Sequence, residues 1–218
     1  MPLLHKMLWC FAVIGCAIVV SACAPGLDDT KSLSALKSAN EGVVFLQLAY
    51  EGLPCRGGNI ALATETAPGR FQLHKTLTMG GITGAASRNS RQVSLPAGTY
   101  HVGYITCQAV QENLSFASGY MMGVGEQDGD FFIGNPKQSL AQFTVAAGEV
   151  VNLGQINLAP TDYLANATRI SVTDINSDAM ARLRGEVPTL SSTMVTRLMT
   201  STAPTQSYKI ERVKLGTG

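Results

Sequence analysis

The groups best suited to covalent chemistry in this chain are the thiols of its five cysteines. One of them, Cys23, directly follows the small residues Ser21 and Ala22. Before these lies an almost wholly apolar run, Met7 to Val20, which a single lysine precedes. A positive start, an apolar core of about 7–15 residues and small residues before a cut define a secretory signal. We therefore expect residues 1–22 to be a signal peptide, cleaved between Ala22 and Cys23.

The sequence Val20-Ser21-Ala22-Cys23 resembles the lipobox of bacterial lipoproteins, in which an aliphatic residue and two small residues precede a cysteine. The resemblance implies that the Cys23 thiol carries diacylglycerol and that the new amino terminus is acylated. Two or more chains anchor a protein stably, whereas one does so only marginally. In this class an Asp after the cysteine tends to retain the protein in the inner membrane. Because Ala24 stands there, the resemblance implies the periplasmic face of the outer membrane.

Two other arrangements of this segment fit less well. Cys16 also follows small and aliphatic residues, but only about nine apolar residues precede it, which is short for a signal core. An uncleaved membrane anchor would need about 20 residues, more than the apolar run supplies. We expect residues 23–40 to be a lipidated polar tether, with room for one helical turn around Leu33 and Leu36.

Composition limits the function of the mature chain. Removing 22 residues from 218 leaves 196, which suits one domain or a domain with an appendage. The signal contains one of the 16 basic residues and no acidic one, so 15 basic and 15 acidic residues remain. A nucleic-acid binder would show a basic excess, so we expect no nucleic-acid partner. The only tryptophan, Trp9, leaves with the signal.

Two further cysteines, Cys55 and Cys107, remain in the mature chain. In an oxidising compartment an even pair favours one disulfide, with two buried free thiols as the alternative. No metal site is expected, because these cysteines and the histidines His74 and His101 show no ligand spacing. Glu126, Asp128 and Asp130 alternate like the start of a calcium loop, but Phe131 and Lys137 occupy positions where that loop needs Gly and Glu.

From residue 43 onward short aliphatic and β-branched runs alternate with Gly, Pro and Asn, which predicts strands over 43–50, 59–65 and 70–79. Alternation in the third strand puts Phe71, Leu73, Lys75 and Leu77 on one side. Residues 79–91 are expected to form a long loop. Arg88 and Arg91 in this loop could bind an anion, but solvated side chains are the simpler interpretation.

The most informative stretch of the mature chain is 93–107, where Pro96-Ala97-Gly98 predicts a tight turn between two strands. Tyr100, Val102, Tyr104 and Thr106 then alternate on one face. A weaker echo, with its turn at Ala147-Gly148, covers 143–156. Two such hairpins are similar to the prealbumin-like or carboxypeptidase-regulatory-like sandwiches of many bacterial lipoproteins. The resemblance implies a mainly β, prealbumin-like or Greek-key sandwich over 41–159 and supplies no catalytic residue.

Past Pro160 the composition changes, and we expect 160–218 to be a short appendage of strand, two helices and edge strand. One more strand is expected over 168–175. Asn176 offers a helix cap for 179–184. Leu190, Met194 and Leu198, spaced by four residues, predict a second short amphipathic helix that packs on the sandwich or docks a partner. Residues 207–215 are expected to close as an edge strand.

No nucleophile elbow, HExxH zinc motif, phosphate loop or dinucleotide fingerprint occurs. His101 and Cys107 have the even spacing of one strand face, but an unbroken strand separates them by about 20 Å. We therefore expect no catalytic residue, no metal and no cofactor beyond the lipid on Cys23. The prediction is a lipid-anchored, periplasm-facing module that binds an envelope protein or polymer. The alternative is a periplasmic hydrolase whose site is assembled from distant segments.

Overall fold

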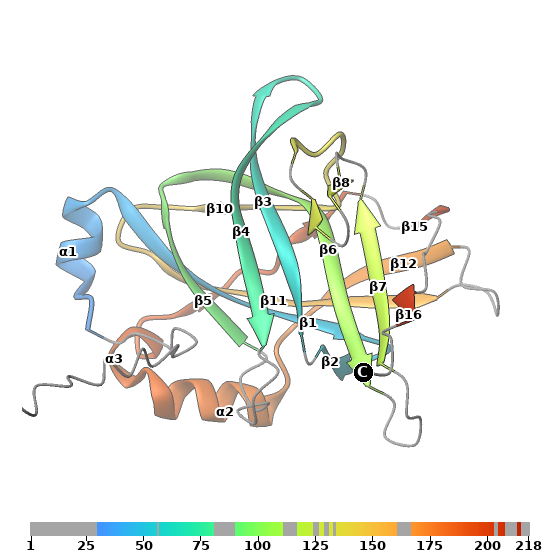
Figure 1. The fold of residues 1–218 in the computed structure, drawn as a ribbon. Coiled ribbons are helices and arrows are strands. Elements are labelled where there is room, and N and C mark those ends of the chain that lie inside the picture. Colours follow the sequence, from blue (N-terminus) through green and yellow to red (C-terminus); the bar gives the residue numbers. More distant parts are fainter. Residues whose placement is uncertain are drawn as a thin grey trace, which may run out of the picture.

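The computed structural model is a mainly β structure with two seven-stranded sheets and short helices (Figure 1). It describes residues 30–55, 57–80, 90–110, 117–123, 127–128, 131–132, 134–160, 167–202, 205–207 and 213–214. One sheet is mixed and the other antiparallel. The expectation of a mainly β protein with short helices near the C-terminus is confirmed at this level.

The mixed sheet, sheet A, is built around β1 (Glu41–Tyr50), which is buried at every residue after Glu41. β1 pairs in parallel with β11 (Val150–Pro160) and antiparallel with two other strands. Its side chains alternate between two clusters, so both of its faces are covered. Such a strand is apolar throughout, as the sequence of β1 is. The remaining strands of sheet A are β2 (Leu53–Pro54), β5 (Ser90–Pro96), β12 (Ala167–Thr173), β13 (Val195–Thr196) and β15 (Thr205–Ser207).

The antiparallel sheet, sheet B, is built around β6 (Gly98–Val110), which pairs with three other strands. These partners are β3 (Gly57–Ala67), β7 (Ala117–Gly123) and β10 (Ala141–Val145). Its outer strands are β4 (Arg70–Gly80), β14 (Thr200–Ser201) and β16 (Val213–Lys214). A separate small sheet consists of β8 (Gln127–Asp128) and β9 (Phe131–Phe132).

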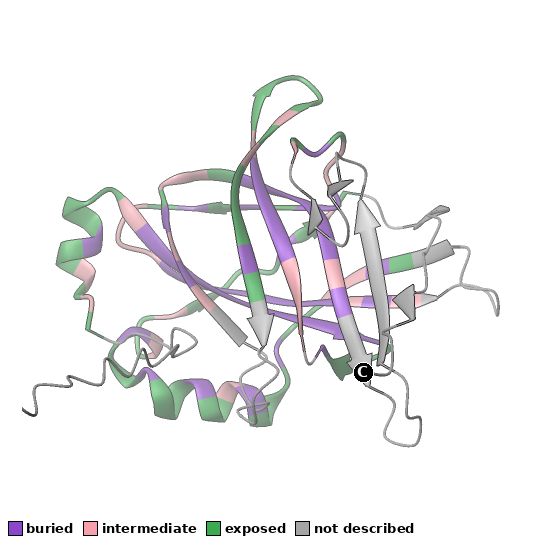
Figure 2. Ribbon diagram, in the orientation of Figure 1, coloured by how far each residue is buried: buried purple, intermediate pink, exposed green. Residues whose placement is uncertain are grey.

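The two sheets share one large hydrophobic cluster, so they pack face to face (Figure 2). Sheet A contributes the inward residues of β1 and β11, and sheet B those of β3, β6 and β10. Fully buried side chains from both sheets include Leu46, Leu48, Leu153, Ile60, Leu62 and Ile105. Burial of this apolar area is the main term that stabilises the fold.

The two turns that the sequence marked as hairpins connect different sheets. β5 belongs to sheet A and β6 to sheet B, while β10 belongs to sheet B and β11 to sheet A. The hairpin prediction was therefore wrong at both places, although the strands and turns are where it put them. Gly148 has φ +76°, a backbone conformation that favours glycine at this turn. Turn chemistry fixes where the chain reverses and does not fix whether the second strand pairs beside the first or crosses the core.

A β-bulge at Gly103 changes which residues of β6 face the core. In the register with β3, Ala61 lies opposite Tyr104 and Leu62 opposite Val102, so Gly103 has no partner. A Cβ atom at Gly103 would overlap the ring of Pro136. Tyr100 and Val102 face the inter-sheet core, whereas Tyr104 belongs to a small cluster on the outer face. The expected single face of Tyr100, Val102, Tyr104 and Thr106 is thus wrong, because the bulge shifts the alternation by one residue.

A second bulge, at His74 in β4, lies on the other side of β3. Both bulges adjoin Leu62 of β3. Leu62 pairs with Lys75 and Ala63 with Leu73, which leaves His74 as the extra residue. Leu73 therefore packs on the outer face, while Leu77 lies in the inter-sheet core. The expected common face of Phe71, Leu73, Lys75 and Leu77 was wrong for the same reason.

Three short helices contribute a second hydrophobic cluster against the outer face of sheet A: α1 (Leu33–Ser38), α2 (Ser177–Glu186) and α3 (Pro188–Ser191). Leu36, Leu183 and Leu190 pack there with Val43 and Phe45 of β1. The helical turn expected around Leu33 and Leu36 is confirmed. So is the Asn176 cap, whose side-chain oxygen accepts the N–H of Ala179 at 2.8 Å.

The second amphipathic helix expected through Leu190, Met194 and Leu198 was wrong beyond its first turn. α3 ends at Ser191, and β13 begins at Val195 and pairs in parallel with β11. Backbone N–H groups of Arg197 and Met199 donate to carbonyls of Asn152 and Leu153, at 3.0 and 3.1 Å. These bonds to a neighbouring strand hold the segment extended. The region 160–218 accordingly supplies strands to both sheets.

Candidate functional site

The proposed anchor, Ala22 and Cys23, lies outside the described residues, as do Arg88, Glu126 and Asp130. Within the described part of the chain, no helix is long and apolar enough to cross a membrane.

Cys55 and Cys107 form the expected disulfide. Cys55 follows β2, an edge strand of sheet A, and Cys107 lies in β6, the central strand of sheet B, so the bond joins the two sheets. Both residues are buried in the inter-sheet core. The bond leaves neither sulfur available as a thiolate nucleophile, which removes the thiol candidates of the sequence.

The one buried histidine of the described residues is His101, which is 6% exposed on the outer face of sheet B. Its neighbours Tyr100 and Val102 point into the inter-sheet core, so its own side chain points the opposite way. Cys107 points into that core, because the bulge at Gly103 lies between them. His101 and Cys107 are therefore on opposite faces, not on the same face that even spacing predicted.

Three segments distant in sequence meet at His101. Its Nδ1 lies 3.0 Å from Ser139 Oγ, and its Nε2 lies 4.0 Å from Glu65 Oε2. The ring of Phe71 packs against the imidazole with centroids 4.9 Å apart. Thr202 Oγ1 lies 2.7 Å from the backbone carbonyl of Ser139 and 3.0 Å from its hydroxyl. We call these five residues the His101 cluster.

The segment that carries Ser139 lies across the outer face of sheet B and is called the strap, residues 134–140. Pro136 is buried against Gly103, and Asn135 Oδ1 accepts the N–H of Leu73 at 2.9 Å. Leu140 N–H donates to Val102 O at 2.7 Å. The strap thus fixes Ser139 beside His101 through contacts at both of its ends.

The tautomer of His101 and the hydroxyl proton of Ser139 are linked. The Ser139 hydroxyl has one proton and two acceptors within reach, Nδ1 of His101 at 3.0 Å and Ala141 O at 3.1 Å. When that proton goes to Ala141 O, Nδ1 is protonated and donates to Ser139 Oγ. When it goes to Nδ1, Nε2 carries the ring proton and faces the Glu65 carboxylate.

Burial lowers the pKa of His101 below its ordinary value of 6.5, because the surroundings disfavour the charged form. The Glu65 carboxylate acts in the opposite direction, but it is the smaller effect and is 40% exposed. The folded protein therefore favours a neutral imidazole.

A serine, a histidine and a carboxylate are the components of a hydrolytic triad, yet their arrangement here lacks one of its contacts. A nucleophilic serine gives its proton to the histidine, and the Ser139 hydroxyl lies within reach of both Nδ1 of His101 and the carbonyl of Ala141. The carboxylate oxygen stands 4.0 Å from the ring, beyond a hydrogen bond.

Metal binding has little support in the described residues. His101 Nε2 and Glu65 could supply two ligands, but no group of three or more His, Cys, Asp or Glu side chains in that part of the chain could hold an ion.

His101 was a candidate from the sequence, whereas Ser139 and Glu65 were not. Strand pairing places Ala63 opposite His101, and Glu65 follows on the same face two residues later. Ser139 comes from the strap, whose path has no sequence signal that we can identify. No known family model matches the chain, and neither the curated proteins nor the solved structures contain a significant match.

Proposed function

We propose that the protein is a bacterial lipoprotein, anchored through lipid on Cys23 to the periplasmic face of the outer membrane. Its two-sheet domain acts as a non-catalytic module that binds an envelope protein or polymer. The lipobox-like Val20-Ser21-Ala22-Cys23 at the end of an apolar run supports the anchor. We also propose that the two-sheet domain is a prealbumin-like or Greek-key sandwich.

The observation that supports the exported location in this proposal is the buried disulfide between Cys55 and Cys107. Disulfides persist in oxidising compartments such as the periplasm and are rare in the cytosol. The disulfide and the amino-terminal sequence therefore point independently to export.

The test compares two cysteine substitutions in the native host. Cys23→Ser should abolish lipidation, leave an unprocessed precursor of higher mass and prevent normal membrane anchoring. Cys16→Ser is the matched control, since the same change at the competing cysteine should leave mass and membrane fraction unchanged. Intact mass spectrometry and membrane fractionation give both readouts. An unlipidated native protein, or normal processing of the Cys23 variant, would contradict the proposal.

A hydrolase is the second candidate, because the His101 cluster does bring a serine, a histidine and a carboxylate together. A fluorophosphonate probe separates the two functions, since it labels activated serines. If the module is non-catalytic, the native protein and the Ser139→Ala variant should show the same labelling. Labelling that both Ser139→Ala and His101→Asn abolish, with the fold intact, would establish the hydrolase instead.

A further inference from the structure

We propose that one end of the molecule, formed by α1 and the two turns that cross between the sheets, lies against the lipid headgroups of the membrane that holds Cys23. We call this surface the α1 end. The inference rests on the proposed lipid anchor and adds which surface of the domain meets the bilayer.

The length of chain between the anchor and the folded body limits how far that body can be from the lipid. The described structure begins at Thr30, seven residues after Cys23. At about 3.3–3.6 Å per residue, the fully extended connection reaches at most about 25 Å. A body held this closely cannot turn freely, so the surface at which the connection enters stays near the membrane.

The entry point is fixed to the body and is not part of a longer flexible tether. Leu36 of α1 is 1% exposed in the cluster that covers sheet A. Lys31 Nζ lies 3.1 Å from both Glu41 Oε2 and Ser94 Oγ. Ser32 caps α1 by accepting the N–H of Ala35 at 3.2 Å. The expected tether of 23–40 is therefore docked from Lys31 onward.

Both inter-sheet turns lie next to α1. Ala97 N–H donates to Asn40 O at 2.8 Å, and Gly148 N–H donates to Glu41 O at 2.7 Å. These bonds join the turn before β6 and the turn before β11 to the residues that follow α1. The α1 end is thus one continuous surface.

The chemistry of the α1 end suits headgroups and not insertion into the acyl chains. Its helix exposes polar and small side chains: Ser34, Ala35, Lys37, Ser38 and, beyond the helix, Ala39 and Asn40. Among the described residues Lys37 has no ion-pair partner at this end, which leaves its ammonium group free to meet lipid phosphate. A single lysine supplies only a weak attraction to an anionic surface. The short connection therefore does most of the orienting.

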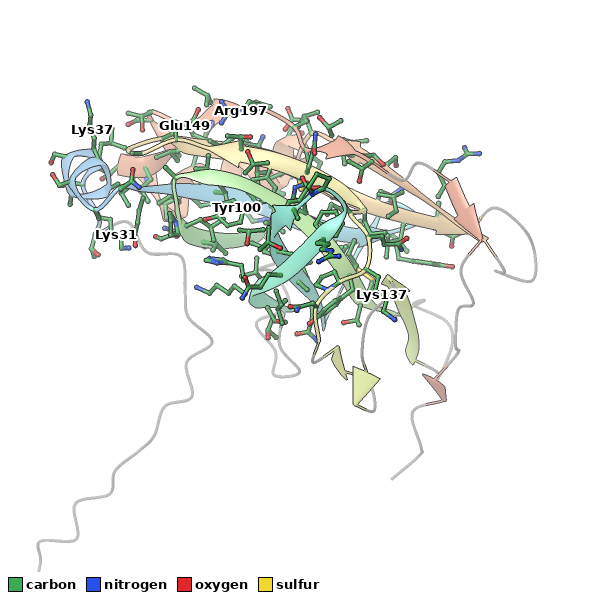
Figure 3. The ribbon with its side chains drawn as sticks, turned by 90° about the horizontal axis from the view of Figure 1, so that it is seen from above. Lys31, Lys37, Tyr100, Lys137, Glu149 and Arg197 are labelled. Carbon is green, nitrogen blue, oxygen red and sulfur yellow. A yellow bond between two sulfur atoms is a disulfide. The ribbon has the colours of Figure 1, made fainter. Side chains whose placement is uncertain are left out.

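The strap lies away from this end. Figure 3 shows Lys31 and Lys37 together at α1, whereas Lys137 of the strap lies at a distance from them on another part of the molecule. Lys137 is exposed. The strap, with the exposed Lys137, would then face the periplasm.

The absence of tryptophan from the mature chain permits a direct test, because Trp9 is the only one in the sequence. Lys37→Trp and Lys137→Trp place the same reporter at two exposed lysines. The lipidated variants are reconstituted in phosphatidylcholine vesicles that contain dansyl-phosphatidylethanolamine, and energy transfer from Trp to dansyl is measured. We expect several-fold greater transfer from position 37. Equal transfer, or greater transfer from position 137, would overturn the inference.

A third variant tests the physical cause. A flexible Gly-Ser segment inserted after Asp29 should reduce transfer from position 37 while vesicle flotation stays unchanged; undiminished transfer would contradict the role of the short connection. Flotation also separates the two proposals. Loss of flotation in the uninserted protein refutes the anchor and with it the inference, whereas normal flotation without the difference in transfer refutes only the inference. Circular dichroism confirms that each variant is folded.

Discussion

The guanidinium of Arg197 donates a 2.6 Å hydrogen bond to Oε2 of Glu149. Glu149 lies in the turn between β10 and β11, and the same oxygen accepts the N–H of Ala146 at 2.9 Å. Arg197 also donates to Thr144 O at 2.8 Å. One carboxylate and one guanidinium therefore join the C-terminal segment to the turn by which the chain crosses from sheet B to sheet A.

Arg197→Gln should destabilise the protein at neutral pH by about 1 kcal/mol or less, because Arg197 is half exposed and solvent screens the pair. The hydrogen bond from Arg197 is the largest cause that lowers the pKa of Glu149 below 4.5. A lowered carboxyl pKa contributes stability that is present above 4.5 and is lost as pH falls through the folded value. Urea unfolding at neutral and acidic pH should show the variant's deficit shrinking in acid. A constant deficit would exclude the ion pair as its cause.

His101→Asn should make stability less dependent on pH. The folded state lowers the pKa of His101, so the native protein should lose stability as pH falls below 6.5, where the unfolded chain takes up the proton first. The asparagine amide keeps a polar group near the position of Nδ1 and cannot titrate. Thermal unfolding between about pH 7 and pH 5 measures this range. His74→Asn is the control at the other mature histidine; if it flattens the curve equally, His101 is not responsible.

Gly103→Ala should destabilise by about 1–3 kcal/mol, because its methyl group would overlap the Pro136 ring and displace the strap. Pro136→Ala in the same chain should restore part of the loss, since it removes ring atoms from that contact. Gly185→Ala on α2 provides the opposite control: nothing lies within 4 Å of its added Cβ, and alanine favours a helix. Denaturant unfolding of the four proteins gives the comparison. A harmless Gly103→Ala would contradict the observed packing of the strap.

Removal of the disulfide by the double change of Cys55 and Cys107 to Ala should cost about 2–4 kcal/mol. The bond closes a long loop, with 52 residues of sequence separation. Calorimetry of the native and double-variant proteins measures the loss. Thiol titration of the unsubstituted protein, denatured without a reducing agent, should find no free thiol at Cys55 or Cys107. One reactive thiol per cysteine there would show that the bond is absent in the native protein.

Local sequence predicted the strands over 43–50, 59–65 and 70–79 because their signals are local, whereas it did not predict β7 within 108–140. Val43 to Tyr50 is apolar on both faces, and β1 is covered on both faces by the inter-sheet core and the helices. The side chain of Asn176 caps α2 as its type and position indicated. Simple alternation failed at Gly103 and His74, because each bulge depends on what lies opposite or above the strand. The helical spacing of Leu190, Met194 and Leu198 failed because strand pairing with β11 competed with it.

By itself the sequence determined where several of the strands lie, where the chain turns, which two cysteines are available to pair and where an anchor is expected. Tertiary structure alone decided that both Ala-Gly turns cross between sheets and that Ser139, Glu65 and Phe71 meet at His101. The physical reason is the distance along the chain over which each kind of interaction acts. Backbone propensity and side-chain alternation act over a few residues, whereas sheet membership, bulge position and the path of the strap depend on contacts between segments far apart in the chain.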